Sequence, residues 1–346
     1  MPGVIGWALA ALVVSWLVAR WVLRHAVRLG LVQHPNQRSS HARPTPAGGG
    51  LGMVVAGTGV GLALAVQYGR WELAGVAALG ALLAAAGWRD DRQPVSATLR
   101  LGIQVGVVAA LVALAIARLP PLDLGGVLRV EGLPLACLLL LAGVWWINLF
   151  NFMDGIDGLA GTQATTMLVA AGAMSFWLAG GHAAGPLWTW LCAVAAAVTG
   201  FLLLNWPPAR LFMGDVGSTW LACMVFALAL LLMTEGGLGY APWVILAAPF
   251  VVDATLTLLT RMLRGERWHE AHRSHVYQRL ARRWGGAPRG HLRATIALLA
   301  LMTLWVVPLA AASARYPGSA AMWVFLAYGP LAVMAIALGA GRQDEH

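Results

Sequence analysis

Long apolar runs separated by short polar segments make up most of this chain. The runs lack the alternation of polar and apolar positions that marks a half-buried strand, and each is long enough to cross a bilayer as a helix. Only helices and closed barrels satisfy every backbone polar group inside lipid, and non-alternating runs favour helices. The pattern therefore predicts eleven transmembrane helices, at 3–23, 49–67, 72–88, 98–117, 133–150, 162–180, 187–205, 217–234, 242–260, 293–312 and 320–340.

The composition supports this assignment and excludes a soluble globular protein. Of the 346 residues, 60% are hydrophobic and 11% are charged, and the mean hydropathy is +0.73. We expect an all-α polytopic integral membrane protein in which residues 1–346 form a single transmembrane domain. Basic residues follow the first run instead of preceding it, which is the reverse of a secretory signal, so this run is expected to be a retained helix.

The distribution of arginine predicts the orientation. All 23 basic residues are arginine, and nineteen of them lie in the segments 20–48, 88–100, 205–216, 261–293 and the carboxyl-terminal tail. The alternate segments hold only four. The positive-inside rule places the first group in the cytoplasm, so the amino terminus is expected in the periplasm and the carboxyl terminus in the cytoplasm.

The net charge of +9 changes the expected partners. Because the arginines follow one side of the membrane and do not form a soluble basic surface, anionic lipids or phosphorylated substrates are expected and nucleic acid is not. No internal repeat of the transporter type is present. The three cysteines lie in apolar runs without metal-ligand spacing and are interpreted as packing residues.

Polar residues gather in the predicted cytoplasmic loops, near 24–48, 88–98, 150–162, 205–217 and 261–292. In "NLFNFMDGIDGLAG", residues 148–161, four polar residues recur every third position. If the helix continues through this stretch, they lie along one side of its inner end. The four residues are Asn148, Asn151, Asp154 and Asp157.

Five acids could share one cavity at the inner face: Asp90, Asp91, Asp154, Asp157 and Asp215. Two like charges ~4 Å apart repel by about 4 kcal/mol near a protein surface, so such a cluster needs compensation. Protonation, pairing with Arg89, Arg92 or Arg210, or a divalent cation would each provide it. Oxygen ligands without thiols suit Mg²⁺ or Mn²⁺. Asp215, between glycines in "MGDVGS", is the best ligand candidate, and a role for Asp215 and Ser218 in capping the next helix is compatible with it.

The last predicted loop is basic and contains evenly spaced histidines. Nine arginines lie between 261 and 293, and His269, His272 and His275 are three apart. Without cysteine, and with so much positive charge, a zinc site is disfavoured, whereas arginine and histidine together suit phosphate. An amphipathic surface helix on anionic lipid is the alternative.

At these residues the sequence resembles the polyprenyl-phosphate N-acetylhexosamine-1-phosphate transferases. The resemblance is carried by "PNQRSSH", "PTPAGGG", "RDD", "NFMDGIDGLAG", "PARLFMGDVGS" and "VVDATLTLLTR", which run in order through most of the chain. It implies that Asp90 and Asp91 are catalytic residues that act on the lipid phosphate, and that Asp215 binds Mg²⁺. The substrate contacts that it implies are Asn151, Asp154, Asp157, His272 and His275. Further substrate contacts are expected at Arg38, His41, Arg210 and Arg273. Asp253 also matches, and either catalysis or a buried pairing with Arg261 or a neighbouring helix is open.

Departures from the family pattern narrow the expected substrate. "HRSH" has Ser274 where a third histidine is usual, Gln33 stands where an acid is usual, and the chain has no lysine. These differences are unlike the peptidoglycan enzyme, and "RSSH" with "HRSH" looks like the subgroup that begins O-antigen or similar polysaccharides. A phospho-N-acetylmuramoyl-pentapeptide transferase is the alternative within the family.

The resemblance implies a reaction at the inner membrane of a bacterium. Undecaprenyl phosphate would attack the β-phosphate of a UDP-N-acetylhexosamine, either UDP-N-acetylglucosamine or a 6-deoxy analogue such as UDP-N-acetylfucosamine, and release UMP. The alternative from another class is a transporter or flippase for a phosphorylated sugar or lipid, which would place its ionisable residues near the bilayer midplane. A homodimer is a further expectation that the sequence leaves open.

Overall fold

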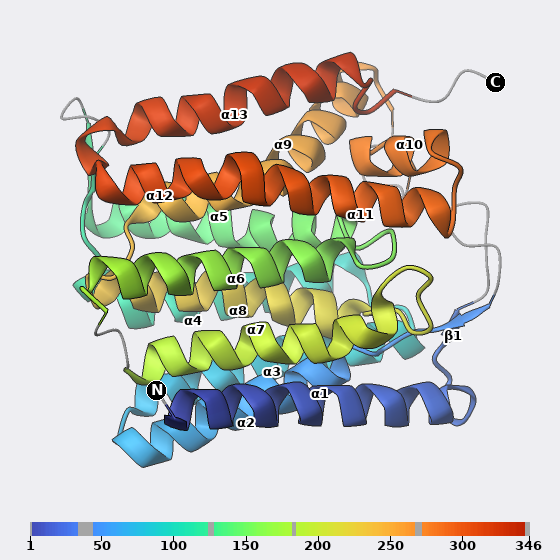
Figure 1. The fold of residues 1–346 in the computed structure, drawn as a ribbon, viewed down its shortest axis with the longest axis horizontal. Coiled ribbons are helices and arrows are strands. Elements are labelled where there is room, and N and C mark those ends of the chain that lie inside the picture. The colour runs from blue at the N-terminus through green and yellow to red at the C-terminus, as the bar shows by residue number, and fades with distance from the viewer. Residues whose placement is uncertain (1, 34–43, 124–127, 182–184, 267–271, 343–346) are drawn as a thin grey trace.

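Helices form nearly all of the regular structure in the computed structural model, which describes residues 2–33, 44–123, 128–181, 185–266 and 272–342 (Figure 1). The helices are α1 (Pro2–Leu29), α2 (Leu51–Tyr68), α3 (Trp71–Arg92), α4 (Ala97–Ala115), α5 (Gly132–Phe152), α6 (Leu159–Leu178), α7 (Pro186–Asn205), α8 (Asp215–Thr234), α9 (Tyr240–Leu263), α10 (Val276–Arg283), α11 (Arg289–Leu301), α12 (Val307–Arg315) and α13 (Ala320–Ala337). The β-structure of these residues is two antiparallel pairs, β1 (Val32–Gln33) with β2 (Thr45–Pro46) and β3 (Leu122–Asp123) with β4 (Arg129–Val130).

Each of the eleven predicted apolar runs forms a helix. Among the described residues, ten helices are long and apolar enough to span a membrane, if 289–315 is counted as one. The remaining run, 162–180, corresponds to α6, which carries several polar residues and lies beside α7 in the bundle (Figure 1). Gln163 on α6 is fully buried and donates a hydrogen bond to the carbonyl oxygen of Leu246, at 2.8 Å. The prediction of an all-α polytopic membrane protein is confirmed, and the placement of the termini stays a prediction.

The segment 289–315 contains a short π-helical stretch, Met302–Val306, between α11 and α12. Pro308 lies in the first turn of α12. Because proline has no amide hydrogen, it cannot continue the regular hydrogen-bond ladder of a helix, and the wider turn precedes it.

Helix α8 lies at the centre of the bundle, with almost every side chain buried. Its amino-terminal end lies against two glycines of other elements. A Cβ atom on Gly87 of α3 would lie 2.4 Å from the carbonyl oxygen of Asp215, and one on Gly50 would lie 2.2 Å from Cα of Gly217. Close backbone approach therefore fixes the start of α8 against α3 and against the entry to α2.

The described parts of the predicted inner loops lie at one end of the bundle, the end that carries α10 and β1 in Figure 1. Backbone hydrogen bonds join the segment before α2 to the segment before α8: Gly49 N–H donates to Phe212 O at 2.9 Å, and Phe212 N–H donates to Pro46 O at 2.8 Å. At the other end, Arg70 forms ion pairs with Glu72 and Glu235. The alternation of loops derived from arginine counts is thus reproduced in three dimensions.

Candidate active site

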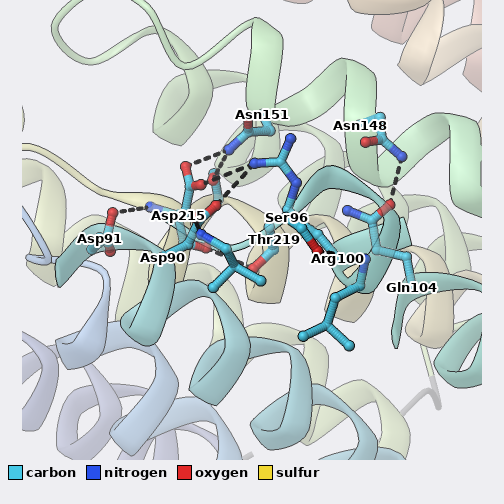
Figure 2. A network of polar contacts seen from close by, with 12 residues as sticks. Asp90, Asp91, Ser96, Arg100, Gln104, Asn148, Asn151, Asp215 and Thr219 are labelled. Carbon is cyan, nitrogen blue, oxygen red and sulfur yellow. Dashed lines mark hydrogen bonds and ion pairs between the residues drawn. The ribbon is translucent and has the colours of Figure 1, made fainter. Parts of the chain in front are cut away.

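Four acids from three separate segments meet at the end of the bundle that collects the arginine-rich loops. Asp90 and Asp91 belong to the last turn of α3, Asp215 begins α8, and Asp154 follows α5. Figure 2 shows Asp90, Asp91 and Asp215 together with the side chains that contact them. These acids were predicted from the sequence to share one cavity, and the fold brings them together.

Asn151 orients the Asp215 carboxylate. Its side-chain amide donates to Oδ1 of Asp215 at 2.8 Å and to Oγ of Ser218 at 2.9 Å (Figure 2). The last turn of α5 is thereby joined to the first turn of α8. The other carboxylate oxygen of Asp215 lies 3.7 Å from Nη1 of Arg100.

Arg100 is the cation of this cluster, and the sequence analysis did not single it out. It donates to Oδ2 of Asp90 at 2.9 Å, while Oδ1 of Asp90 accepts the amide of Val95 at 2.7 Å. Arg89, one of the cations expected to pair with the acids, instead donates to Gln93. The serine at position 96 is the sequence feature that could have indicated Arg100. Its side chain caps α4, so the first turn of α4, which carries Arg100, starts close to the end of α3.

Asp91 caps α8. Its two oxygens accept the backbone amides of Asp215, at 2.8 Å, and Val216, at 3.1 Å. A carboxylate in this position also interacts favourably with the helix dipole. The cap that the sequence assigned to Asp215 and Ser218 is therefore supplied by Asp91, 124 residues earlier in the chain.

Asp154 lies half-buried in the α5–α6 loop, and its carboxylate accepts no hydrogen bond from the described part of the chain. Burial, followed by the negative charges of Asp215 and Asp91, raises the pKa of Asp154 well above its ordinary value. An acid in this position is stabilised in its charged form by a nearby cation. The carboxylate oxygens of Asp154, near Asp215, are thus available as ligands for a cation.

The helix does not continue from 148 to 157, the condition under which the four polar residues would share one side. Helix α5 ends at Phe152, and Gly158 adopts a φ of 74° in the turn that leads into α6, a conformation that glycine tolerates and L side chains rarely adopt. The four polar residues therefore point in different directions. Asn148 donates to Gln104 of α4 at 2.7 Å, which ties α5 to α4 outside the acidic cluster (Figure 2).

Asp157 lies beneath the cluster with only 3% of its surface exposed. Its Oδ2 accepts the amide of Ala209 at 3.0 Å, and its Oδ1 lies 3.3 Å from Nδ1 of His291. These contacts join the α5–α6 loop to the α7–α8 loop and to α11. Through its described contacts, Asp157 stabilises the packing of these three segments. A direct contact with substrate stays a prediction.

Asp253 holds the histidine-containing segment. Its carboxylate accepts the amides of Val276, at 2.9 Å, and Tyr277, at 3.0 Å, and lies 3.2 Å from Nδ1 of His275. The residue on α9 whose role the sequence left open is therefore a buried partner of the α10 amino terminus. Arg261, the partner considered for it, pairs with Glu266 at 2.8 Å.

His272 and His275 lie in different environments. The His275 side chain is 3% exposed and stacks between the rings of Phe152 and Tyr277. His272 is half-buried, and its Nδ1 lies 2.9 Å from the hydroxyl of Ser274. Burial, followed by the electrostatic influence of the neighbouring His275 and Arg261 side chains, lowers the pKa of His272 to about 3. His272 is therefore a neutral hydrogen-bonding group at neutral pH in this environment.

The remaining expected substrate contacts are not established by the structure. Arg38 and His41 lie outside the described residues, as does the evenly spaced His269, so their expected roles stay predictions. Arg210 lines a separate cavity between α1 and α7. Arg273 lies beside His272, and its carbonyl oxygen accepts a hydrogen bond from Arg282 at 2.8 Å.

An apolar cavity of about 410 Å³ adjoins the cluster, between α9, α10, α11 and α13. Met153 and Tyr277 line it next to the α5–α6 loop, and Asp253 is an acidic residue in its lining. The remaining lining is mostly aliphatic. The cavity could accommodate part of a hydrocarbon chain close to the acidic residues.

The donors present suit a hard divalent cation that also binds a phosphorylated ligand. Within the described ranges, no three His, Cys, Asp or Glu side chains form a ready-made metal cluster. Mg²⁺ commonly takes one or two carboxylates and completes its shell with water and substrate phosphates. Asp215 fits that mode, because among the described residues Arg100 is the cation that forms ion pairs with Asp90 and Asp215, and the other nearby carboxylates leave negative charge for a metal ion to offset.

A glycine at the centre of the α5–α6 loop provides a test of this geometry. A Cβ atom on Gly155 would lie 2.1 Å from the hydroxyl of Tyr277, which itself donates to Phe152 O at 2.9 Å. We expect Gly155→Ala to displace the loop that carries Asp154 and to lower kcat/KM by about 10- to 100-fold, as small misplacements at active sites do. Steady-state kinetics of the purified variant measure this loss.

Gly102→Ala is the matched control, because a Cβ atom at that position on α4 meets nothing within 4 Å. Its activity should remain within about twofold of the unsubstituted protein, as expected for surface changes. Equal activities of the two alanine variants would show that the loop position does not matter for turnover.

The sequence model of glycosyl transferase family 4 matches residues 73–233. A decaprenyl-phosphate N-acetylglucosaminephosphotransferase from Mycolicibacterium smegmatis is 27% identical over 91% of this chain and 83% of its own length. An undecaprenyl-phosphate α-N-acetylglucosaminyl 1-phosphate transferase from Escherichia coli is 30% identical, over 87% of this chain and 81% of its own length. A phospho-N-acetylmuramoyl-pentapeptide-transferase from Synechococcus elongatus is 31% identical, over 68% of each chain.

Proposed function

Because this chain belongs to glycosyl transferase family 4, we propose that it transfers N-acetylhexosamine 1-phosphate from a UDP-sugar to undecaprenyl phosphate and releases UMP. The convergence of Asp90, Asp154 and Asp215 at one end of a membrane-spanning bundle carries this proposal. The adjoining apolar cavity supports a lipid acceptor, because it brings hydrocarbon-binding surface next to polar groups. Family membership supports sugar-phosphate transfer by a multi-pass membrane protein. The identities of the UDP-sugar and of the lipid acceptor are our proposal.

Mg²⁺, or Mn²⁺ in its place, is the proposed cofactor, with Asp215 as its principal ligand. When bound, it would neutralise charge on the diphosphate of the sugar nucleotide. Asn151 fixes the Asp215 carboxylate by its hydrogen bond. Asp91 fixes the backbone of the same residue. The chain thus holds its principal metal ligand from two directions.

The hydrogen bonds of Asp90 and Asp91 favour direct attack by the lipid phosphate over a covalent enzyme intermediate. A phosphate monoester has a second pKa near 6, so the acceptor is already largely dianionic and does not require a strong base. Both oxygens of Asp91 accept backbone amides, and both oxygens of Asp90 accept hydrogen bonds. These contacts reduce the nucleophilicity of both carboxylates. We therefore assign them a role in positioning and not in forming a covalent intermediate.

The acceptor and donor are proposed to meet at the cytoplasmic face of the bacterial inner membrane. The arginine distribution supports this side, and the described loops that carry it lie together. UDP-N-acetylglucosamine is the first candidate, because two of the relatives above are named for N-acetylglucosamine. A 6-deoxy sugar and a role in O-antigen synthesis are narrower proposals that rest on "HRSH" and "RSSH".

Release of UMP tests the proposed reaction. Purified protein with UDP-N-acetylglucosamine, undecaprenyl phosphate and Mg²⁺ should produce UMP and glycolipid in equal amounts. Removal of the metal with EDTA should abolish production, and added Mg²⁺ should restore it, because the acids alone repel the diphosphate. A transporter would move its substrate and yield no UMP, so absence of UMP with every substrate tried would overturn the proposal.

A panel of sugar nucleotides separates the alternatives within the family. UDP-N-acetylglucosamine and UDP-N-acetylfucosamine are expected to give the highest kcat/KM. UDP-N-acetylmuramoyl-pentapeptide is expected to give little product, because the chain has no lysine to supply the nucleotide contacts of the peptidoglycan enzyme. The reverse order would assign the chain to peptidoglycan synthesis.

A further inference from the structure

A second cavity, lined by basic residues, lies between α1 and the end of α7, apart from the acidic cluster. Its volume is about 470 Å³, and three arginines line it: Arg20, Arg24 and Arg210. The acidic cluster is built on α3, α8 and the α5–α6 loop, and none of its residues lines this cavity. The proposed transfer reaction therefore leaves these three arginines without a role.

The three side chains come from two elements that are fixed against each other. Arg20 and Arg24 are four residues apart and hence lie on one face of α1. Arg210 follows α7, and its backbone amide donates to Leu204 O at 2.9 Å. Helices α1 and α7 pack along their length (Figure 1). The cavity is thus a permanent feature of the helix packing.

The arginines have no described partner of opposite charge. No ion pair or hydrogen bond involves their guanidinium groups within the described residues, and the lining contains no acidic side chain. Three guanidinium groups around one cavity repel one another. An anion with several acceptor oxygens would offset this repulsion, and arginine binds phosphate oxygens through paired hydrogen bonds.

The apolar part of the lining points to a lipid as the source of that anion. Trp16 lies one turn deeper along α1, with the guanidinium of Arg20 over its ring at 5.1 Å. Leu23, Leu203 and Leu204 complete the lining, and Leu203 is 61% exposed on the surface of a membrane-spanning helix. Tryptophan prefers the membrane interface, and exposed leucine prefers hydrocarbon. A headgroup at the arginines would have its acyl chains beside these residues.

We propose that the Arg20–Arg24–Arg210 cavity binds the phosphate of an anionic membrane phospholipid, at a site distinct from both substrates. Basic pockets between transmembrane helices on the cytoplasmic side bind anionic headgroups in this way. The bound phosphate connects α1 to the loop after α7. Five residues further along, the same loop delivers Asp215 to the acidic cluster, so the lipid would steady the segment that carries the metal ligand.

Lipid binding to the full-length protein tests this proposal. Delipidated protein in a neutral detergent is titrated with phosphatidylglycerol, and bound lipid is measured by native mass spectrometry with thermal stability as a second readout. R20Q/R24Q is expected to weaken binding at least about tenfold, in proportion to the loss of two charge-assisted contacts. R28Q removes one positive charge a turn further along α1 and outside the cavity, which makes it the matched control for the single variants R20Q and R24Q, and it should bind within about twofold of the unsubstituted protein.

The choice of probes distinguishes the possible sources of phosphate. Phosphatidylcholine should bind more weakly than phosphatidylglycerol, and inorganic phosphate at millimolar concentration should not displace the lipid. If inorganic phosphate competes fully, or if only undecaprenyl phosphate binds through these arginines, the cavity is a soluble-anion or substrate site and the proposal is wrong.

Equal lipid binding by R20Q/R24Q and R28Q would also overturn the proposal. Should the double variant fail to fold, R20Q and R24Q alone provide the comparison, with about threefold weaker binding expected for each. R20K/R24K, which keeps the charges but loses the paired hydrogen bonds, should bind more tightly than R20Q/R24Q.

Discussion

Replacing Asp215 with asparagine is expected to abolish turnover while the protein stays folded. The substitution keeps the side chain's shape and one acceptor oxygen for the amide of Asn151, but it removes the charge that would hold the metal ion. A metal ion at a phosphoryl-transfer site contributes several kcal/mol of charge stabilisation, so kcat/KM should fall by about 10³-fold, equivalent to about 4 kcal/mol. Initial rates of UMP release over a range of substrate concentrations, at saturating Mg²⁺, measure the loss.

Glu131→Gln is the control for Asp215→Asn. Glu131 precedes α5 and forms an exposed ion pair with Arg129 at 3.1 Å. It lies at the opposite end of α5 from the acidic cluster, so its neutralisation should leave activity nearly unchanged. Both variants should elute as monodisperse protein with similar thermal stability. Near-normal turnover by Asp215→Asn would remove Asp215 as the principal ligand.

Replacing Asp253 with asparagine is expected to cause the second largest effect, through structure. The carboxylate accepts two backbone amides and the hydroxyl of Thr257, and it also contacts His275. An asparagine side chain would direct its NH₂ group toward one set of these donors. Leaving buried donors without an acceptor should lower the free energy of unfolding by about 2–4 kcal/mol. Thermal unfolding of the purified variant measures this change.

Activity should fall with Asp253→Asn because the segment from His272 to Tyr277 loses its anchor. Thr257→Val removes one donor to the same carboxylate without introducing an opposing one, so it should cost only about 1 kcal/mol and preserve most activity. Limited proteolysis after Arg273 should be faster in Asp253→Asn than in Thr257→Val. Full stability of Asp253→Asn combined with loss of turnover would instead assign Asp253 to catalysis.

The helices were predictable because the bilayer imposes a simple requirement on sequence. Any segment that crosses it must be apolar for about 20 residues and must satisfy its own backbone. Helix α6 shows where this signal weakens. Its polar side chain Gln163 donates to Leu246 O of a neighbouring helix, so its environment is protein and its sequence need not be as apolar as that of a lipid-facing helix.

The acids of the site were predictable, whereas their partners were not. Acidic residues in an apolar chain stand out in the sequence, and their place at helix ends indicated one face. Asp91 caps a helix that begins 124 residues later, and no local pattern encodes that distance. Arg100 was missed because the sequence analysis searched for cations next to the acids, and the tight turn at Ser96 folds this arginine back from the next helix.

The predicted helix 133–150 ends close to the observed end of α5 at Phe152, but its considered continuation through residue 157 does not occur, for a local reason. A three-residue spacing of polar positions suggested a continued helix, but Gly155 and Gly158 lie within the same stretch. Glycine lowers helix stability and permits the positive φ that Gly158 adopts. The turn places Asp154 toward Asp215 and Asp157 toward the core, a separation of roles that a single helical face cannot provide.

Electron paramagnetic resonance of bound Mn²⁺ tests the central claim most directly. The protein should bind one Mn²⁺ whose affinity rises at least about tenfold when UDP-N-acetylglucosamine is present, with hyperfine coupling to phosphorus nuclei of the diphosphate. Asp215→Asn should lose the coupled signal, and Glu131→Gln should retain it. An unchanged phosphorus-coupled signal in Asp215→Asn would contradict a metal ion held by Asp215 against a sugar nucleotide.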